Sequence, residues 1–215
     1  MKKKFISLLF LPFGLIPLTS LGQISSGTIL MNGSIGFSSE NTQFDTSSNQ
    51  ENYKSNGFSI LPKIGYFLSE NLAVGVGFTY STYRQKSGST IQNKNLNYSF
   101  GPFVRYYKFL GEKTAIFGNA AFDYSKNITE TFNSNLDLSP YTKYKNVGVY
   151  FTPGLTYFAS SKIGLEISLG SIGIYKNLSE NYINTASYYE MKRSGLGTYF
   201  GLANTSLGIN FYLGR

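Results

Sequence analysis

Side chains that could carry out covalent or acid–base chemistry are scarce in this chain of 215 residues. Histidine and cysteine are both absent. Without histidine the chain lacks the general base that most often works near neutral pH, and without cysteine it also lacks thiol nucleophiles and the usual ligands of structural zinc. No glycine-rich phosphate loop precedes a helical pattern. We therefore predict no catalytic residue, no metal site and no cofactor.

Four ionisable residues stand out because the alternation around them places them on the polar face of a predicted strand: Lys63, Arg105, Asp123 and Glu166. Charges that leave water must be paired or hydrated. One interpretation is an interior network of ion pairs and hydrogen bonds. Four uncharged polar residues on the same faces would join it: Asn32, Asn119, Tyr107 and Tyr150. The alternative is a charged constriction in a pore.

The elements that position these residues are strands, because apolar residues recur at every second position along the chain. In 72–81, for example, Leu, Val, Phe and Tyr at even positions alternate with Ala, Gly, Thr and Ser at odd ones. Eight strands are predicted: about 28–38, 57–66, 72–82, 96–107, 114–125, 145–157, 162–175 and 197–213. The phase slips near Gly170, which indicates a bulge. The last strand has no clean phase before Leu207.

The connections between the strands are of two kinds. An aromatic pair followed by a short polar turn occurs three times, in 66–72, 107–113 and 157–163, whereas long polar connections occupy 39–56, 83–95, 126–144 and 176–194. Short turns at one end and long loops at the other are typical of a transmembrane β-barrel. The predicted fold is therefore all-β, a single antiparallel up-and-down transmembrane β-barrel of eight strands. A split of the first long connection near Phe44 or Tyr53 would give ten.

The first 22 residues have the pattern of a cleaved signal peptide. Three lysines follow Met1, an apolar stretch runs from 5 to 18, and small residues precede Gln23. The apolar stretch is too short, and too interrupted by proline, for a spanning helix, so we favour a signal peptide over a membrane anchor. The barrel domain would occupy 23–215. Charged residues make up 14% of the chain, against about 25% in a typical soluble domain.

Aromatic residues gather at the ends of the predicted strands, where a barrel meets the lipid–water interface. Simple β-propensity is the alternative explanation. The girdle predicted at the short-turn end comprises Tyr66, Phe67, Phe109, Tyr157, Phe158, Phe211 and Tyr212. Three prolines fit the strands poorly because proline cannot donate a ladder hydrogen bond: Pro62, Pro102 and Pro153.

The long connections carry most of the positive charge of a chain whose formal net charge is +8. These cations could attract anionic lipid head groups or surface polysaccharide, or could simply be solvated. A nucleic-acid partner is not predicted, because no basic groove can be argued. The residues concerned are Lys54, Arg84, Lys86, Lys94, Lys126, Lys143, Lys145, Lys176, Lys192 and Arg193.

The signal peptide, the turns and the alternation together give the chain a family resemblance. In particular, residues 65–75, reading GYFLSENLAVG, and the closing 206–213, reading SLGINFYL, resemble the small outer-membrane β-barrel superfamily of OmpA, OmpX and OmpW type. The resemblance implies the outer membrane of a Gram-negative bacterium. It implies outer-membrane lipids, lipopolysaccharide and the barrel-assembly machinery as partners. It fixes no site residues and no oligomeric state.

Three functions follow as hypotheses. The first is a non-enzymatic outer-membrane barrel that contributes to envelope structure or makes surface contacts through its long loops. The second is a narrow, porin-like channel for small or apolar solutes. The third is a secreted, soluble barrel that binds a ligand. The first two differ in whether the lumen conducts.

Overall fold

A computed structural model describes residues 24–45, 50–87, 90–132, 141–183, 186–201 and 205–214. The predicted signal peptide, residues 1–22, lies outside them. Every regular element in the described residues is a strand. No helix long and apolar enough to span a membrane occurs in this part of the chain. The strands are β1 (Ile29–Asn32), β2 (Ile35–Asp45), β3 (Gln50–Ile60), β4 (Lys63–Ser69), β5 (Leu72–Ser87), β6 (Thr90–Phe109), β7 (Thr114–Thr131), β8 (Tyr141–Phe158), β9 (Ile163–Ser168), β10 (Ser171–Ile183), β11 (Ala186–Tyr199) and β12 (Ser206–Leu213).

These twelve segments form eight antiparallel passes, which confirms the predicted fold. Four passes are interrupted, so that β1 continues into β2, β3 into β4, β9 into β10 and β11 into β12. The ten-stranded alternative is wrong, because Phe44 and Tyr53 lie in β2 and β3, which pair with each other as one hairpin. The phase slip near Gly170 is confirmed: β9 ends at Ser168, β10 begins at Ser171, and Gly170 between them has a φ of +95°.

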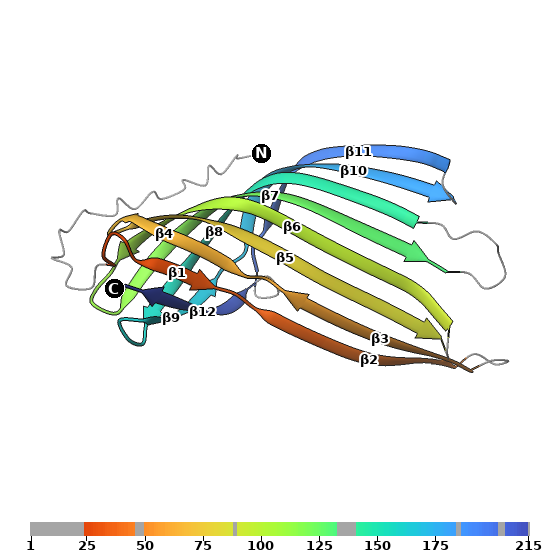
Figure 1. Ribbon diagram of the computed structural model, residues 1–215, viewed down its shortest axis with the longest axis horizontal. Helices are drawn as coiled ribbons and strands as arrows, with labels where there is room; N and C mark the ends of the chain where they lie inside the picture. Colours follow the sequence, from red (N-terminus) through yellow and green to blue (C-terminus); the bar gives the residue numbers. More distant parts are fainter. Residues whose placement is uncertain are drawn as a thin grey trace, which may run out of the picture.

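The barrel closes at its short-turn end and opens toward the other. We call the half at the short-turn end the lower half and the other half the upper half. A complete ring of paired strands forms the lower half, made of β1, β4, β5, β6, β7, β8, β9 and β12. In the upper half, the pairing order is β2-β3-β5-β6-β7-β8-β10-β11, and neither β2 nor β11 has a second neighbour among the described residues. Figure 1 shows this upper sheet as a long curved wall that extends from the ring.

The three prolines lie where hydrogen-bonded ladders are interrupted. Pro62 separates β3 from β4. Pro102 lies where the β6–β7 register skips from Phe100 to Phe103. Pro153 lies where the neighbour of β8 changes from β9 to β10. The missing N–H of each proline therefore falls at a position where no regular ladder bond is made.

The strands run well beyond their predicted ends, and this corrects the assignment of four long loops. Strands cover 39–45, 50–56, 83–87, 90–95, 126–131, 141–144, 176–183 and 186–194 of the stretches predicted as loops. Polar residues had suggested loops, but an antiparallel ladder is formed by backbone groups and does not require apolar side chains. The upper half is thus a sheet with polar side chains on its inner face.

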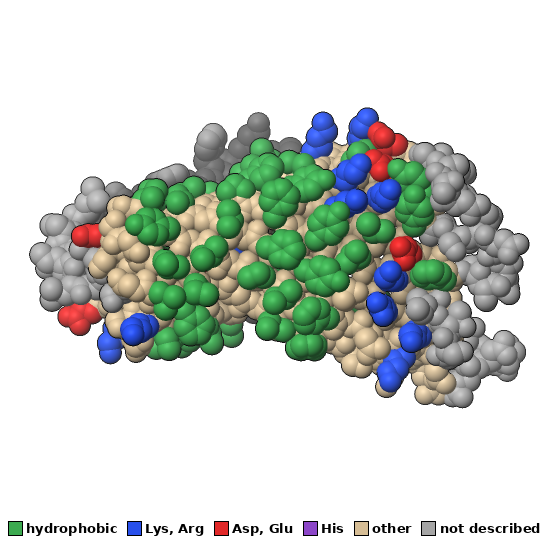
Figure 2. Space-filling view, viewed as in Figure 1, with side chains coloured by type: hydrophobic (Ala, Val, Ile, Leu, Met, Phe, Trp, Pro, Cys, Tyr) green, Lys and Arg blue, Asp and Glu red, His purple; other side chains and the backbone are tan. Residues whose placement is uncertain are grey.

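The outer surface carries a broad apolar band. Two members, Leu207 and Phe37, are 84% and 81% exposed, and Figure 2 shows apolar side chains across the middle of the molecule. Soluble monomers rarely expose contiguous apolar patches larger than a few hundred Å². The predicted outward phase of the last strand is confirmed, because Leu207, Ile209, Phe211 and Leu213 are all exposed.

Candidate functional site

A buried ion pair crosses the lumen of the closed ring. Nη1 of Arg105, on β6, donates to Oε2 of Glu166, on β9, at 2.6 Å, and Nη2 lies 3.5 Å from Oε1. The two residues are 5% and 8% exposed. Each points inward because it alternates with outward-facing neighbours on its own strand: Val104 and Tyr106 flank Arg105 and are exposed, and Leu165 next to Glu166 is exposed as well. The structure therefore brings together two of the four ionisable residues selected from the sequence.

Neutral side chains complete the hydrogen bonding of this pair. Nε of Arg105 donates to Oδ1 of Asn119 at 3.2 Å, and Nδ2 of Asn210 donates to Oε2 of Glu166 at 2.6 Å. Nη1 of Arg105 also donates to the hydroxyl of Tyr107 at 3.3 Å. A buried ion pair is tolerated when its remaining donors and acceptors are satisfied in this way. We call Arg105, Glu166, Asn119 and Asn210 the polar layer.

An aromatic floor lies directly below the polar layer. The hydroxyls of Tyr107 and Tyr212 are 3.2 Å apart. The ring centroid of Phe67 lies 5.6 Å from that of Tyr107, and the ring of Phe158 lies 5.3 Å from that of Tyr212. Ile24 is fully buried in the same cluster. Together with the polar layer, these side chains fill the lumen, as expected for eight strands.

Part of the predicted aromatic girdle is therefore wrong. Phe67, Phe158 and Tyr212 are buried inside the barrel, and Phe109 packs against the same core. The reason is that the two-residue period continues to the last residue of each strand, so that one aromatic of each pair faces outward and its neighbour faces inward. Tyr66, Tyr157 and Phe211 remain on the outer surface, between 44% and 49% exposed; their role as a girdle remains a prediction.

Two tightly packed positions hold the lumen side chains in place. A Cβ built on Gly154 would lie 2.3 Å from Cζ of Phe117, and one on Gly75 would lie 2.5 Å from Cζ of Phe103. Only a residue without a side chain leaves room for these rings. Cζ of Arg105 in turn lies 4.4 Å from the centroid of Phe117, a cation–π distance.

Lys63 and Asp123 lie above the polar layer and are not part of it. Both line a cavity of about 290 Å³ together with Asn119, Phe103 and Tyr150. Neither forms an ion pair within the described residues. The sequence prediction left out Asn210 and assigned Tyr212 to the outer girdle, although the outward phase of Ile209 and Phe211 places both residues inside the barrel.

A belt of cations lies on the outer surface directly above the apolar band. Across β7, β8, β10 and β11, one outward row reads Phe122, Val149, Ile174 and Leu196. Two rows higher it reads Lys126, Lys145, Leu178 and Lys192. Figure 2 shows lysine and arginine side chains gathered at this end of the apolar surface.

Like charges lie directly opposite each other at three points of this cation belt. The opposed partners are Lys54 and Lys86, Arg84 and Lys94, and Lys126 and Lys145. Opposed like charges destabilise a sheet. Glutamates compensate some of them. Nζ of Lys145 lies 2.7 Å from Oε1 of Glu180, and this hydrogen bond raises the pKa of Lys145 and lowers the pKa of Glu180.

The inner face of the upper sheet is polar and mostly uncharged. Register partners form rows of small polar side chains, such as Ser99, Ser125, Asn146 and Asn177 across β6, β7, β8 and β10. Amides and hydroxyls also bond to each other, as where Nδ2 of Asn95 donates to Oδ1 of Asn127 at 3.0 Å. No group of three or more potential carboxylate metal ligands occurs within the described residues.

Comparison with protein-family models gives no match to the sequence, and neither does comparison with curated proteins. Among solved structures, the outer membrane protein OprG from Pseudomonas aeruginosa is similar, with a TM-score of 0.54 and 10% identity over 91% of this chain and 100% of OprG. The Neisserial surface protein A, NspA, gives a TM-score of 0.39 and 16% identity over 86% of this chain and 97% of NspA. The similarity to OprG supports the fold, a β-barrel of the outer-membrane type.

Proposed function

We propose that this chain is a non-enzymatic outer-membrane protein of a Gram-negative bacterium, with a non-conducting lumen and its open, strand-extended half displayed at the cell surface. The observation that carries the proposal is the closed ring filled by the polar layer and the aromatic floor. Arg105, Glu166 and Asn210 are at most 8% exposed, and Tyr107 and Tyr212 below them are fully buried.

Placement in a membrane is supported by the outer surface. An apolar band around an antiparallel barrel suits the hydrocarbon core of a bilayer. A secreted, soluble barrel would expose residues such as Phe37 and Leu207 to water, which disfavours that alternative. The orientation follows from the general rule that short turns of such barrels face the periplasm and the longer hairpins face outward.

Lipopolysaccharide is the proposed partner of the cation belt. The belt begins immediately above the apolar rows, at the height where lipid head groups meet a barrel. Around Glu180 and Glu190 there are five lysines on the outer face of β7, β8, β10 and β11: Lys126, Lys143, Lys145, Lys176 and Lys192. Lipid phosphates would relieve the repulsion that these glutamates leave uncompensated.

A channel for small solutes is the weaker alternative. A conducting path would have to pass Arg105, whose guanidinium is held by Glu166, Asn119 and the Phe117 ring. Moving these side chains would break a hydrogen-bonded ion pair inside the barrel, and such a rearrangement is costly. The sealed layer therefore favours a role at the surface over passage through the lumen.

Conductance in a planar lipid bilayer tests the proposal. The refolded full-length chain is expected to insert, as verified by flotation with lipid vesicles, and to give no ion conductance steps. Reproducible steps from the inserted wild-type protein would refute the sealed lumen. In that case Lys63→Glu, which reverses a charge beside the lumen cavity, should change the ion selectivity of the steps.

A further inference from the structure

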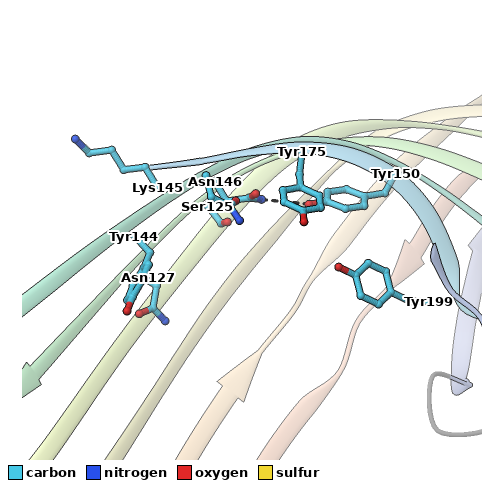
Figure 3. Close-up of a pocket in the computed structure, with 9 residues that line it drawn as sticks. Ser125, Asn127, Tyr144, Lys145, Asn146, Tyr150, Tyr175 and Tyr199 are labelled. Atoms are coloured by element: carbon cyan, nitrogen blue, oxygen red, sulfur yellow. Dashed lines mark hydrogen bonds between the residues drawn. The ribbon is translucent and has the colours of Figure 1, made fainter. Parts of the chain in front are cut away.

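A cavity in the open half is lined mainly by amide and hydroxyl side chains. Its volume is about 330 Å³, at the lower end of the range of about 300–1,000 Å³ found for small-molecule sites. Eight side chains that carry amide or hydroxyl groups surround it: Ser125, Asn127, Tyr144, Asn146, Tyr150, Tyr175, Asn177 and Tyr199. Lys145 also contributes atoms, but Figure 3 shows its side chain pointing away from the cavity. We call this cavity the polar pocket.

Two tyrosine rings lie along the wall of the polar pocket. A Cβ on Gly148 would be 2.6 Å from the Tyr150 ring on one edge, and a Cβ on Gly173 would be 2.3 Å from it on the other. The Tyr150 ring therefore lies down over two glycines. Tyr175 covers Gly195 in a similar way, with its hydroxyl 3.1 Å from where a Cβ would be. Figure 3 shows Tyr150 and Tyr175 next to each other.

The amides next to these rings can both donate and accept hydrogen bonds. Asn146 and Asn177 are register partners on β8 and β10. Nδ2 of Asn146 donates to the Tyr150 hydroxyl at 3.3 Å. Oδ1 of Asn177 is buried and has no hydrogen-bond partner within the described residues. An unpaired buried acceptor costs free energy unless a ligand or water donates to it, so this oxygen marks a position for a donor.

Ionised groups lie at the margins of the polar pocket. Asp123 lines the neighbouring cavity below. Arg193 lies beside Asn177 in the same row, and its Nε donates to the sulfur of Met191 at 3.1 Å. The lining thus offers no cluster of cations for a phosphate or carboxylate.

We propose that the polar pocket binds a neutral saccharide. Flat aromatic rings pack against the apolar C–H faces of sugar rings, while amides that donate and accept match neighbouring hydroxyl groups. The approach from the cell exterior rests on the proposed function, which places the open half outward; the chemistry of the pocket does not depend on it.

Isothermal titration calorimetry of the refolded full-length chain tests this proposal. A zwitterionic detergent is used so that no sugar head group competes. The probes are maltotriose, cellotriose and chitotriose, with trigalacturonate as an anionic trisaccharide of similar size. At least one neutral trisaccharide should bind with a Kd of about 10 μM to 1 mM, and at least tenfold more tightly than trigalacturonate. Failure of all three neutral sugars to bind, or preference for trigalacturonate, would overturn the proposal.

Matched variants place the binding in the polar pocket. Tyr175→Ala and Asn177→Ala should each weaken binding by about tenfold, the effect of one lost hydrogen bond or ring contact. Tyr124→Ala is the control, because it removes the same ring from the outer face of β7, opposite Val147, and should leave the Kd unchanged. Equal Kd values for Tyr175→Ala, Asn177→Ala and the wild type would refute the pocket.

The two proposals can fail separately. The titration requires neither a membrane nor a known orientation of the barrel. A protein that inserts into bilayers without conducting ions and does not bind any of the neutral saccharides would therefore refute only the saccharide site. A conducting barrel that still binds a neutral trisaccharide through Tyr175 and Asn177 would refute only the sealed lumen.

Discussion

Removing Glu166 should destabilise the barrel more than removing any exposed carboxylate. In Glu166→Ala, the guanidinium of Arg105, 5% exposed, loses its counter-charge, and Nδ2 of Asn210 loses an acceptor at 2.6 Å. Breaking a buried pair by deleting one partner costs about 3–5 kcal/mol. The free energy of unfolding is measured by urea titration in detergent micelles, followed by far-ultraviolet circular dichroism.

Two further variants separate the cause from the loss of any carboxylate. Glu130→Ala is the control: Glu130 lies 3.4 Å from Lys94 in a pair whose side chains are 37% and 39% exposed, so its removal should cost about 0–1 kcal/mol. The double variant Arg105→Met, Glu166→Leu should recover most of the loss, because replacing both charges leaves no uncompensated ion. If Glu166→Ala unfolds at the same urea concentration as Glu130→Ala, the reasoning about the polar layer is refuted.

Two other predictions concern the outer surface. Because the hydrogen bond from Lys145 lowers the pKa of Glu180, this pair stabilises the fold above the ordinary glutamate pKa of about 4.3, and the stabilisation is lost as the pH falls below it. Glu180→Gln should therefore make the free energy of unfolding in urea fall less between pH 5 and pH 3. The same decrease in the variant and the wild type would contradict this. Vesicles that contain lipopolysaccharide should raise the free energy of unfolding of the protein relative to phosphate-free vesicles. Lys126→Gln should reduce this difference, whereas Lys108→Gln, at the short-turn end, should not. Equal effects of the two substitutions would argue against the cation belt.

Much of the closed ring could be predicted from the sequence because its strands have two unlike faces. Alternation gave the strand count, the slip at Gly170 and the outward phase of Leu207 and Ile209. It also selected Arg105 and Glu166, since few ionisable residues share the inner phase. The same alternation also places Phe67 inside, because it is opposite in phase to Tyr66. Position at a strand end is therefore a weaker indicator of an outward side chain than the two-residue phase.

The upper half could not be predicted in the same way, because polarity does not distinguish a solvated strand from a loop. Residues such as Asn95 and Asn127 have side chains typical of loops, yet their backbones are paired in β6 and β7. What extends these strands is the ladder itself, which continues upward from the apolar rows without a new nucleus. The partners of the polar layer also depended on register: Asn210 meets Glu166 only because β12 pairs with β9.

The interruptions in the strands explain why the barrel has two halves. A ring closes only where the first and last passes pair, and that pairing ends at Asn32 and Asn210. Directly beyond Asn32 the strand is interrupted at Gly33, and the neighbouring pass is interrupted at Pro62. Because both passes are interrupted at this height, β2 and β3 can bend away from β12 while remaining paired to each other and to β5. The seal at the base and the open polar wall above it thus have a common origin in a few residues that cannot, or do not, continue a ladder.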